Sequence, residues 1–347
     1  MRRIRICYFD QWAGALEPVA AYLSRVPTMD LRPLVANPRD AALLRKARLD
    51  CDWYAANARC FAAMQHPDLE FLPAWITGRK GVLDLGRAPR EPGEERWLIT
   101  MAHQPQSLGD LAGKVFAVLS KLNVRHLFYA FDEASRNMSC FNAIAPHLDV
   151  LIHDEAPLAP EGRAGLRPSC VTQHRSWVAN FVPHESEFNP EPEEKIYFLG
   201  SQLGLTPHRR RQLDFLRTRF PDRLVASHDH STPVDGRVAL NRFKVGLCPE
   251  GRMFASSAMR ATHTDRPFWS GCLGMVPVSE DSRESGRLEE LQATNLIVRY
   301  AHGDLESLAQ ACERGLAMSA VDRRRIYDHF NARETVGSVV AEALAAA

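Results

Sequence analysis

The sequence lacks the features that mark membrane and secreted proteins. No run of ~18 apolar residues occurs in its 347 residues, which argues against a transmembrane helix. The charged start at 2–5 precedes no apolar stretch long enough for a signal peptide. The eight cysteines are scattered and form no Cys-x-x-Cys pair, which favours buried, reduced thiols over disulfides or a zinc site. We therefore expect a cytoplasmic protein without a transmembrane segment.

The sequence also lacks an excess of either charge. Lys and Arg number 43 and Asp and Glu 42, so the net charge is +1, which argues against a broadly basic nucleic-acid-binding surface. The basic cluster at 208–211 has no interleaved aromatic residue, so a solvated helix face or a single phosphate contact explains it better than nucleic acid. Only six of the basic residues are lysine, a bias typical of a GC-rich genome, and we expect a bacterial source.

Common cofactor motifs are missing. Neither the Gly-x-Gly-x-x-Gly dinucleotide motif nor the Gly-x-x-x-x-Gly-Lys-Ser/Thr phosphate loop occurs. His228 and His230 would share one face of a strand, but the sequence places no third or fourth metal ligand beside them. We expect no metal ion and no cofactor.

The sequence does have the apolar content and the alternation of an α/β protein. Hydrophobic residues make up 45% of the chain, and the length predicts two domains. Apolar segments at 2–9, 97–101, 126–131 and 150–152 read as buried strands, each followed by polar residues. Strands of this kind, separated by segments with helical spacing such as 107–122, predict a parallel sheet.

A proline-rich and acidic segment interrupts this alternation. Residues 183–194 carry three prolines and five glutamates, a composition that favours a linker over a helix or an inner strand. We therefore predict two Rossmann-like domains, 1–182 and 195–333, facing each other across a cleft, and a C-terminal helix at 334–347.

The second half repeats the strand-and-helix order. Thr206 and Pro207 have the residue types of an N-cap and a first helical position, which predicts a helix that ends near Phe220. Further strands are expected at 195–200, 224–226, 245–248, 274–278 and 295–299, and further helices at 305–316 and 320–331.

The segment 243–281 carries the clearest chemical pattern. Glu250 comes just after a predicted buried strand, where a carboxylate can bind two hydroxyl groups of a sugar. Arg260 and Arg266 flank the start of the next predicted helix, and their guanidinium groups suit a diphosphate. This combination favours a sugar nucleotide as ligand.

The same segment resembles the donor-binding region of GT-B glycosyltransferases. The nearest patterns are those of the exostosin-like, α1,3-fucosyltransferase and CgeB-like groups. Glu250 matches the acidic position after the strand, Thr264-Asp265-Arg266 resembles their Thr-Glu-Lys, and 274–278 is similar to their Gly-x-Val-Pro-Val strand. Arg266 and Trp269 stand where many retaining enzymes of this fold have a second glutamate, so either stereochemical outcome stays open.

The resemblance implies a metal-independent transfer of a sugar from a UDP-, GDP- or dTDP-linked donor to a glycan, lipid, protein or small molecule. In such an enzyme the carboxyl-terminal domain binds the donor and the amino-terminal domain binds the acceptor. The donor-binding residues implied here are Gly200, Ser201, Arg209, Glu250, Arg260, Thr264, Asp265 and Arg266.

An inverting transfer needs a base that deprotonates the acceptor hydroxyl, whereas a retaining one does not. Polar residues that follow predicted strands of the first domain are Asp10, His103, Asp132, Glu133 and Asp154. Among them we favour Asp132 or Glu133, and then Asp10. Two other functions remain open, namely a sugar-nucleotide epimerase or hydrolase and a non-catalytic protein that binds a nucleotide or a glycan.

Overall fold

The computed structural model describes most of the chain, and every structural statement below concerns that part. The described residues are 1–9, 57, 59–77, 81–82, 84–101, 104–130, 140–153, 165–175, 178–198, 206–226, 238–249, 265–281 and 286–347. The chain divides into two compact units. The first comprises Met1–His153, Leu158–Gln173 and Val340–Ala347, and the second Asp154–Pro157 and His174–Val339.

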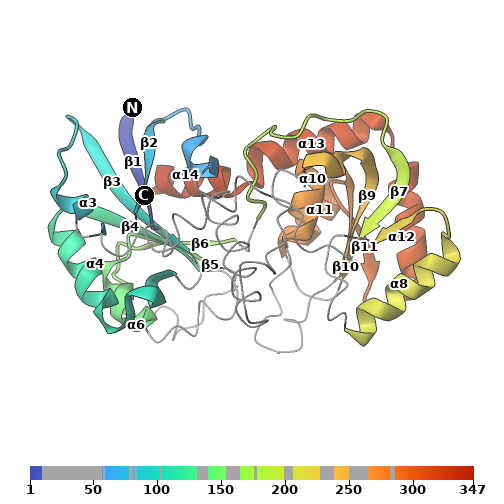
Figure 1. Ribbon diagram of the computed structural model, residues 1–347, viewed down its shortest axis with the longest axis horizontal. Helices are drawn as coiled ribbons and strands as arrows, with labels where there is room; N and C mark the ends of the chain where they lie inside the picture. Colours follow the sequence, from blue (N-terminus) through green and yellow to red (C-terminus); the bar gives the residue numbers. More distant parts are fainter. Residues whose placement is uncertain are drawn as a thin grey trace, which may run out of the picture. The chain divides into compact units, whose positions relative to one another are not determined.

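The first unit is built on a six-stranded sheet with the order β2-β1-β3-β4-β5-β6 (Figure 1). The strand pairs β1–β2, β1–β3, β3–β4 and β4–β5 are parallel. The strands are β1 (Arg2–Phe9), β2 (Leu69–Thr77), β3 (Glu94–Met101), β4 (Val124–Ala130), β5 (Val150–His153) and β6 (Val171–His174). Its helices are α3 (Asp84–Arg87), α4 (Ala112–Lys121) and α6 (Phe141–Ile144), with 3₁₀ turns η2 (Gln104–Leu111) and η3 (Ala145–His147).

The core of the first unit forms where α4 packs on the sheet. Ala112, Phe116 and Leu119 are buried, and their spacing of four and three residues puts them on one face of the helix. They join a cluster that includes Leu98 of β3 and Phe128 of β4. Burial of this apolar face, rather than intrinsic helix propensity, holds a ten-residue helix such as α4 in place.

The second unit is built on a five-stranded sheet with the order β11-β10-β9-β7-β8, in which every pair is parallel (Figure 1). The strands are β7 (Glu193–Phe198), β8 (Leu224–Ala226), β9 (Phe243–Cys248), β10 (Val276–Asp281) and β11 (Val298–Ala301). The helices are α8 (Pro207–Arg219), α10 (Arg266–Cys272), α11 (Gly286–Ala293), α12 (Leu305–Ala317) and α13 (Ala320–Arg333), with the 3₁₀ turn η4 (Val238–Arg242). The last helix, α14 (Val336–Ala346), begins in this unit and continues into the residues 340–347 of the first unit.

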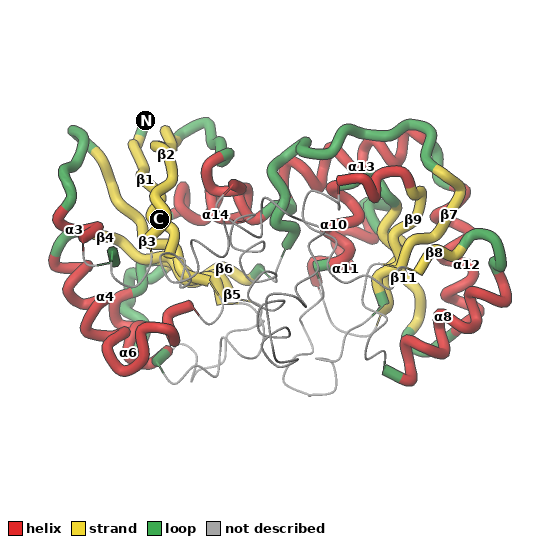
Figure 2. Tube along the Cα trace, viewed as in Figure 1, coloured by secondary structure: helices red, strands yellow, loops and turns green. Residues whose placement is uncertain are grey.

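Close packing joins α10 to α13, which run beside each other in Figure 2. A Cβ atom at Gly271 of α10 would lie only 2.2 Å from the Phe330 ring of α13. Gly274, which follows α10, has a φ of +73°, and a Cβ there would lie 2.9 Å from Phe188. Both glycines therefore have a packing role that needs no ligand.

The proline-rich segment expected to be a linker lies within the second unit and is bound to α13. The His184 N–H donates to Asn331 Oδ1 at 2.7 Å, and the Tyr327 hydroxyl donates to the Ser186 carbonyl at 2.6 Å. The buried Arg323 guanidinium donates to the carbonyls of 189–190. These bonds hold residues 184–190 along α13, so this part of the segment is not a free linker.

The predicted α/β architecture, with two parallel-sheet units and a C-terminal helix, is confirmed. Each unit has a parallel sheet covered by helices, and the chain ends in the helix α14. The predicted helix after Thr206 is also confirmed, because α8 runs from Pro207 to Arg219. The elements β2, β6 and α11 have no counterpart among the predicted strands and helices. Among the described helices, none combines the length and the apolar character needed to cross a membrane.

Substitution of Gly271 by alanine is expected to destabilise the second unit. The added Cβ would overlap the Phe330 ring, and overpacking of this kind typically costs about 1–3 kcal/mol. Gly286→Ala is the matched control, because nothing lies within 4 Å of a Cβ at the start of α11. Urea denaturation followed by circular dichroism measures both variants. Equal stabilities of Gly271→Ala and Gly286→Ala would contradict the packing role.

Stability is expected to fall as the pH falls below about 6.5, the ordinary pKa of histidine. Burial of His126 in β4 lowers its pKa to about 3, helped by the nearby charges of His147 and Arg167. Between these two values the unfolded chain binds a proton that the folded chain does not, so the free energy of unfolding drops by about 1.4 kcal/mol per pH unit. His126→Gln should remove this contribution, and denaturation at pH 7, 6 and 5 would then give a smaller slope. An unchanged slope would rule out this assignment.

Candidate functional site

The carboxyl edge of the second sheet gathers polar groups from several elements. Because all five strands run parallel, their carboxyl ends lie at one edge. The helices α8 and α10 follow β7 and β9 in the chain, so both begin at this edge. Ligands of open α/β sheets bind outside the carboxyl ends of the strands, which makes this edge the first place to search for a site.

The first turn of α8 holds an arginine against the sheet. The Thr206 side chain accepts a hydrogen bond from the Arg209 N–H at 3.3 Å, and Pro207 occupies the first helical position. Arg209 lies on the same buried face of the helix as Gln212, Leu213 and Leu216, and it is only 7% exposed. Its Nη2 donates to the Pro249 carbonyl, directly after β9, at 3.4 Å.

The start of α10 brings a second arginine to the same carbonyl. Arg266 Nη1 donates to the Pro249 carbonyl oxygen at 2.8 Å. Asp265, the residue before the helix, accepts a hydrogen bond from Nε1 of Trp269, one turn further along, at 3.1 Å. This bond holds the Asp265 carboxylate against the first turn of α10. Two guanidinium groups from separate helices therefore converge at the end of β9.

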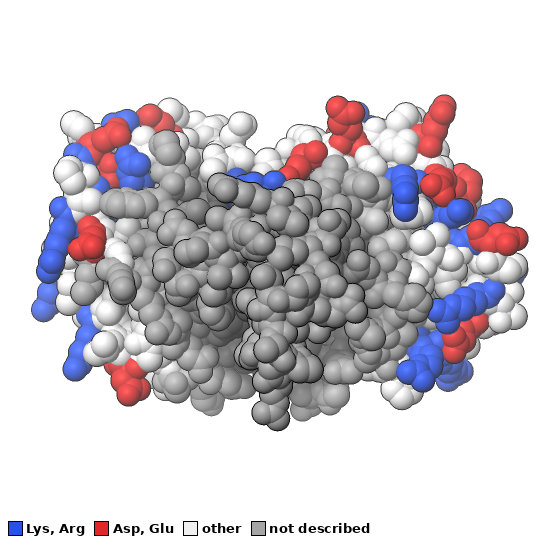
Figure 3. All heavy atoms as spheres, viewed as in Figure 1, with Lys and Arg blue, Asp and Glu red and all other residues white. Residues whose placement is uncertain are grey.

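The other arginines of α8 lie on its solvent side. Arg210 and Arg211 are exposed, and Arg217 and Arg219 form exposed ion pairs with carboxylates. Figure 3 shows basic side chains gathered where Figure 1 draws α8, with acidic side chains among them. Paired charges on an exposed helix face contribute little to stability and are typical of a solvated surface.

A buried carboxylate lies at the neighbouring strand end. The side chain of Glu280, in β10, is fully buried, and its Oε1 lies within hydrogen-bond distance of four nitrogen atoms. These are His208 Nε2 at 2.6 Å, Gln212 Nε2 at 2.9 Å, His302 Nδ1 at 3.0 Å and the Gly303 N–H at 3.3 Å. The two imidazole rings stack at 4.7 Å between centroids. A charge out of water needs such partners.

The turn after β11 explains how His302 and Gly303 reach this carboxylate. Gly303 has a φ of +73°, a conformation that side chains disfavour, and its N–H faces Glu280. Asp304 caps α12 by accepting a hydrogen bond from the Ser307 N–H at 3.0 Å. The Ser307 hydroxyl in turn accepts from the Ala301 N–H at 3.0 Å, which closes the turn.

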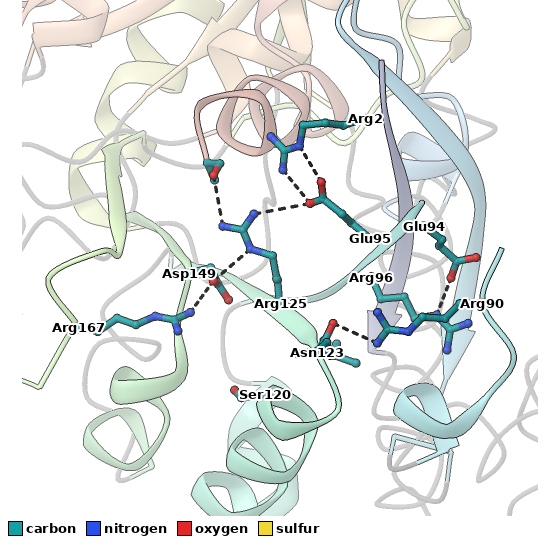
Figure 4. A pocket seen from close by; sticks show the side chains of 12 residues that line it. Arg2, Arg90, Glu94, Glu95, Arg96, Ser120, Asn123, Arg125, Asp149 and Arg167 are labelled. Atoms are coloured by element: carbon teal, nitrogen blue, oxygen red, sulfur yellow. Dashed lines mark hydrogen bonds and ion pairs between the residues drawn. The ribbon is translucent and has the colours of Figure 1, made fainter. Parts of the chain in front are cut away.

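The described part of the first unit also contains a cavity of about 700 Å³, at the amino ends of β1, β3 and β4. Figure 4 shows how its charges pair. Arg2 makes two hydrogen bonds to Glu95, which lowers the pKa of that carboxyl group, and Arg125 reaches Glu95 and Asp149. Arg167 also pairs with Asp149. Because the charges neutralise one another at the edge opposite the carboxyl ends, we assign this network to the fold.

Of the predicted donor-binding residues, the structure describes Arg209, Asp265 and Arg266. Both arginines donate to the Pro249 carbonyl, and the Asp265 carboxylate accepts a hydrogen bond from Trp269. The remaining predicted residues lie outside the described residues, and their roles stay predictions. They are Asp10, Asp132, Glu133, Gly200, Ser201, Glu250, Arg260 and Thr264, together with His103 and Asp154.

Comparison with known proteins gives no family. No protein-family description matches the sequence, and no curated protein matches it either. Among solved structures, Anabaena Alr3699/HepE in complex with UDP matches with 10% identity and a TM-score of 0.43, covering all of both chains. Sucrose-phosphate synthase from Thermosynechococcus elongatus matches with 12% identity and a TM-score of 0.42, covering 99% of this chain and 100% of that one. The spinosyn rhamnosyltransferase SpnG has 11% identity and a TM-score of 0.40, covering 85% and 97%.

Sequence reasoning missed the group around Glu280. The sequence places His208 in a basic cluster, and neither Glu280 nor His302 is among the predicted site residues. The signal that could have found them is the one that selected Glu250: Glu280 lies at the end of β10 and His302 directly follows β11. Their separation in the chain hides the contact, because only the strand order β11-β10-β9-β7 brings these ends together.

Substitution of Glu280 by glutamine is expected to destabilise the second unit by about 1–3 kcal/mol, because it removes the charge that satisfies buried donors. Glu289→Gln, at an exposed position of α11, is the control and should change stability by less than about 0.5 kcal/mol. Urea denaturation at pH 7 measures both. If Glu280→Gln lowers the free energy of unfolding no more than the control does, the Glu280 carboxylate does not stabilise the carboxyl edge of the sheet.

Proposed function

We propose that the chain is a glycosyltransferase that takes its sugar from a nucleotide-diphosphate donor bound by the second unit. The convergence of Arg209 and Arg266 on the Pro249 carbonyl supports this proposal most directly. It places two permanent positive charges at the carboxyl end of an inner strand of a parallel sheet, where such folds bind charged ligands.

The two arginines suit the chemistry of the leaving group. When the bond between the sugar and the diphosphate breaks, negative charge builds up on the departing phosphate oxygens. Guanidinium groups fixed in advance near these oxygens stabilise that charge without a reorganisation step. In this proposal they supply the positive charge, so that the diphosphate needs no metal ion.

The residue that follows Pro249 in the chain is Glu250, which we propose as the group that binds the sugar hydroxyls. Asp265, Arg260 and Thr264 would complete the donor site from the segment before α10, as the resemblance to GT-B donor regions implies. Gly200 and Ser201 follow β7 in the chain, and their small side chains would let the protein backbone approach the donor closely.

The acceptor is proposed to bind to the first unit. An inverting transfer would need a carboxylate there that removes the proton of the acceptor hydroxyl as the new bond forms. Asp132 and Glu133 follow β4 in the chain, and Asp10 follows β1. We propose Asp132 or Glu133 as this base, with Asp10 as the next candidate.

Nucleotide binding tests the donor site. Purified protein titrated with UDP, GDP and dTDP should melt at a higher temperature with at least one of them, because a ligand of the folded state stabilises it. Arg266→Ala should weaken that binding by about 10- to 100-fold, the effect of losing one charge-assisted hydrogen bond of about 1.5–3 kcal/mol. Isothermal titration calorimetry gives the dissociation constants.

The matched control is Arg210→Ala, which removes an exposed arginine from α8 and should leave binding unchanged. Failure of all three nucleotides to bind the folded native protein, or equal weakening by both variants, would defeat the proposal. With the sugar nucleotide that binds, a transferase releases nucleoside diphosphate only when an acceptor is present. Release without an acceptor would instead indicate a hydrolase, and isomerisation an epimerase.

A further inference from the structure

We infer that His208, Glu280 and His302 form a binding site for a zinc-type divalent ion. The site goes beyond the proposed function and does not rest on it, because the arginines at Pro249 carry the diphosphate in that proposal. The three side chains come from the first turn of α8, the end of β10 and the turn after β11. Their ligand atoms all lie within 4.8 Å of one another.

The chemistry of the three ligands selects the class of ion. Two imidazole nitrogens and one carboxylate oxygen are ligands that zinc and other first-row transition ions bind, whereas Mg²⁺ and Ca²⁺ prefer oxygen ligands throughout. Zinc lies about 2.0–2.2 Å from nitrogen and oxygen ligands, so neighbouring ligands of a tetrahedral site are about 3.3 Å apart. Glu280 Oε1 lies 2.6 Å from His208 Nε2 and 3.0 Å from His302 Nδ1, so small outward shifts would admit the ion.

The hydrogen bonds around Glu280 show a conflict that a cation would resolve. Oε1 has four nitrogen neighbours, more than the roughly two hydrogen bonds that the lone pairs of one carboxylate oxygen accept. In addition, His208 Nε2 lies 3.0 Å from Gln212 Nε2. The Tyr300 hydroxyl donates to Gln212 Oε1, so the Gln212 amide group presents its N–H bonds to His208 and Glu280.

The proton positions cannot satisfy both neighbours of His208 Nε2. If this nitrogen carries a proton, it donates to Glu280 but meets an N–H bond of Gln212. If it carries none, it accepts from Gln212 but turns its lone pair toward the Glu280 oxygen only 2.6 Å away. A metal ion between His208 Nε2 and Glu280 Oε1 would take up both lone pairs, and Gln212 would remain as an outer hydrogen-bond donor to the ligating carboxylate.

Access to this site is open on the histidine side. The side chain of Glu280 is fully buried, whereas those of His208 and His302 are 32% and 58% exposed. An ion held by the three side chains would therefore have a fourth position that water or an oxygen atom of a ligand can occupy. The bound ion would also link the first turn of α8 to the ends of β10 and β11.

Zinc binding to the full chain tests this inference directly. Protein stripped of metal by dialysis against a chelator, then titrated with Zn²⁺ in a calorimeter, should bind one ion per chain at this site. His302→Ala removes a ligand and should weaken zinc binding by at least about 100-fold. Gln212→Ala removes only a hydrogen-bond partner of the ligand Glu280 and should weaken zinc binding less, by about 10- to 100-fold. His302 is largely exposed, so its loss leaves the fold intact, which circular dichroism checks.

His66→Ala, which removes a histidine of the first unit, is the matched control and should leave zinc affinity unchanged. Co²⁺ in place of zinc should give visible bands without the strong thiolate absorption of a cysteine site, and a tenfold excess of Mg²⁺ should not displace it. Zinc binding that is absent from the native chain, or equally strong in His302→Ala, would overturn the inference. A thiolate absorption band lost with a cysteine variant would also overturn it, because the ion would then lie elsewhere.

Discussion

The parallel direction of every strand in the second sheet is the constraint on which the rest depends. It forces each connection to cross back to the amino edge, so the carboxyl ends of β9, β10 and β11 and the starts of α8 and α10 meet at one edge. Backbone carbonyls and side chains at the strand ends lie close together there, although the residues that carry them are far apart in the chain. Arg209 and Arg266 reach one carbonyl in this way, and Glu280 reaches two histidines.

Burial decides what each of these groups can do. Arg209 lies against the sheet and points at Pro249, whereas its neighbour Arg210 is exposed, although the two are adjacent in the chain. Glu280 is enclosed and surrounded by donors, so its negative charge depends on partners that α8 and the turn after β11 supply. In the first unit, by contrast, the arginines of the amino edge are paired with Glu95 and Asp149, which neutralise their charges.

Much of the architecture could be predicted because it depends on local patterns. Apolar runs such as 2–9 and 245–248 are readable as buried strands, and Thr206 with Pro207 marks the start of α8. The strand β2 was not anticipated, since its sequence Leu-Glu-Phe-Leu-Pro contains a proline and no clear alternation. The proline-rich segment at 183–194 has the composition of a linker, yet its hydrogen bonds to Arg323, Tyr327 and Asn331 of α13 follow only from the packing of distant elements.

The sequence by itself therefore determined the α/β fold class, most of the buried strands and the start of α8, and it predicted that arginines after β7 and β9 bind phosphate. These follow from apolar spacing, capping residues and the residue types that follow strands, all of which act over a few residues. Only the tertiary structure decided which arginine of 209–211 faces the sheet and that Glu280 meets His208 and His302. Such contacts join residues 72 and 22 positions apart, and they depend on strand order and helix rotation, which no short segment encodes.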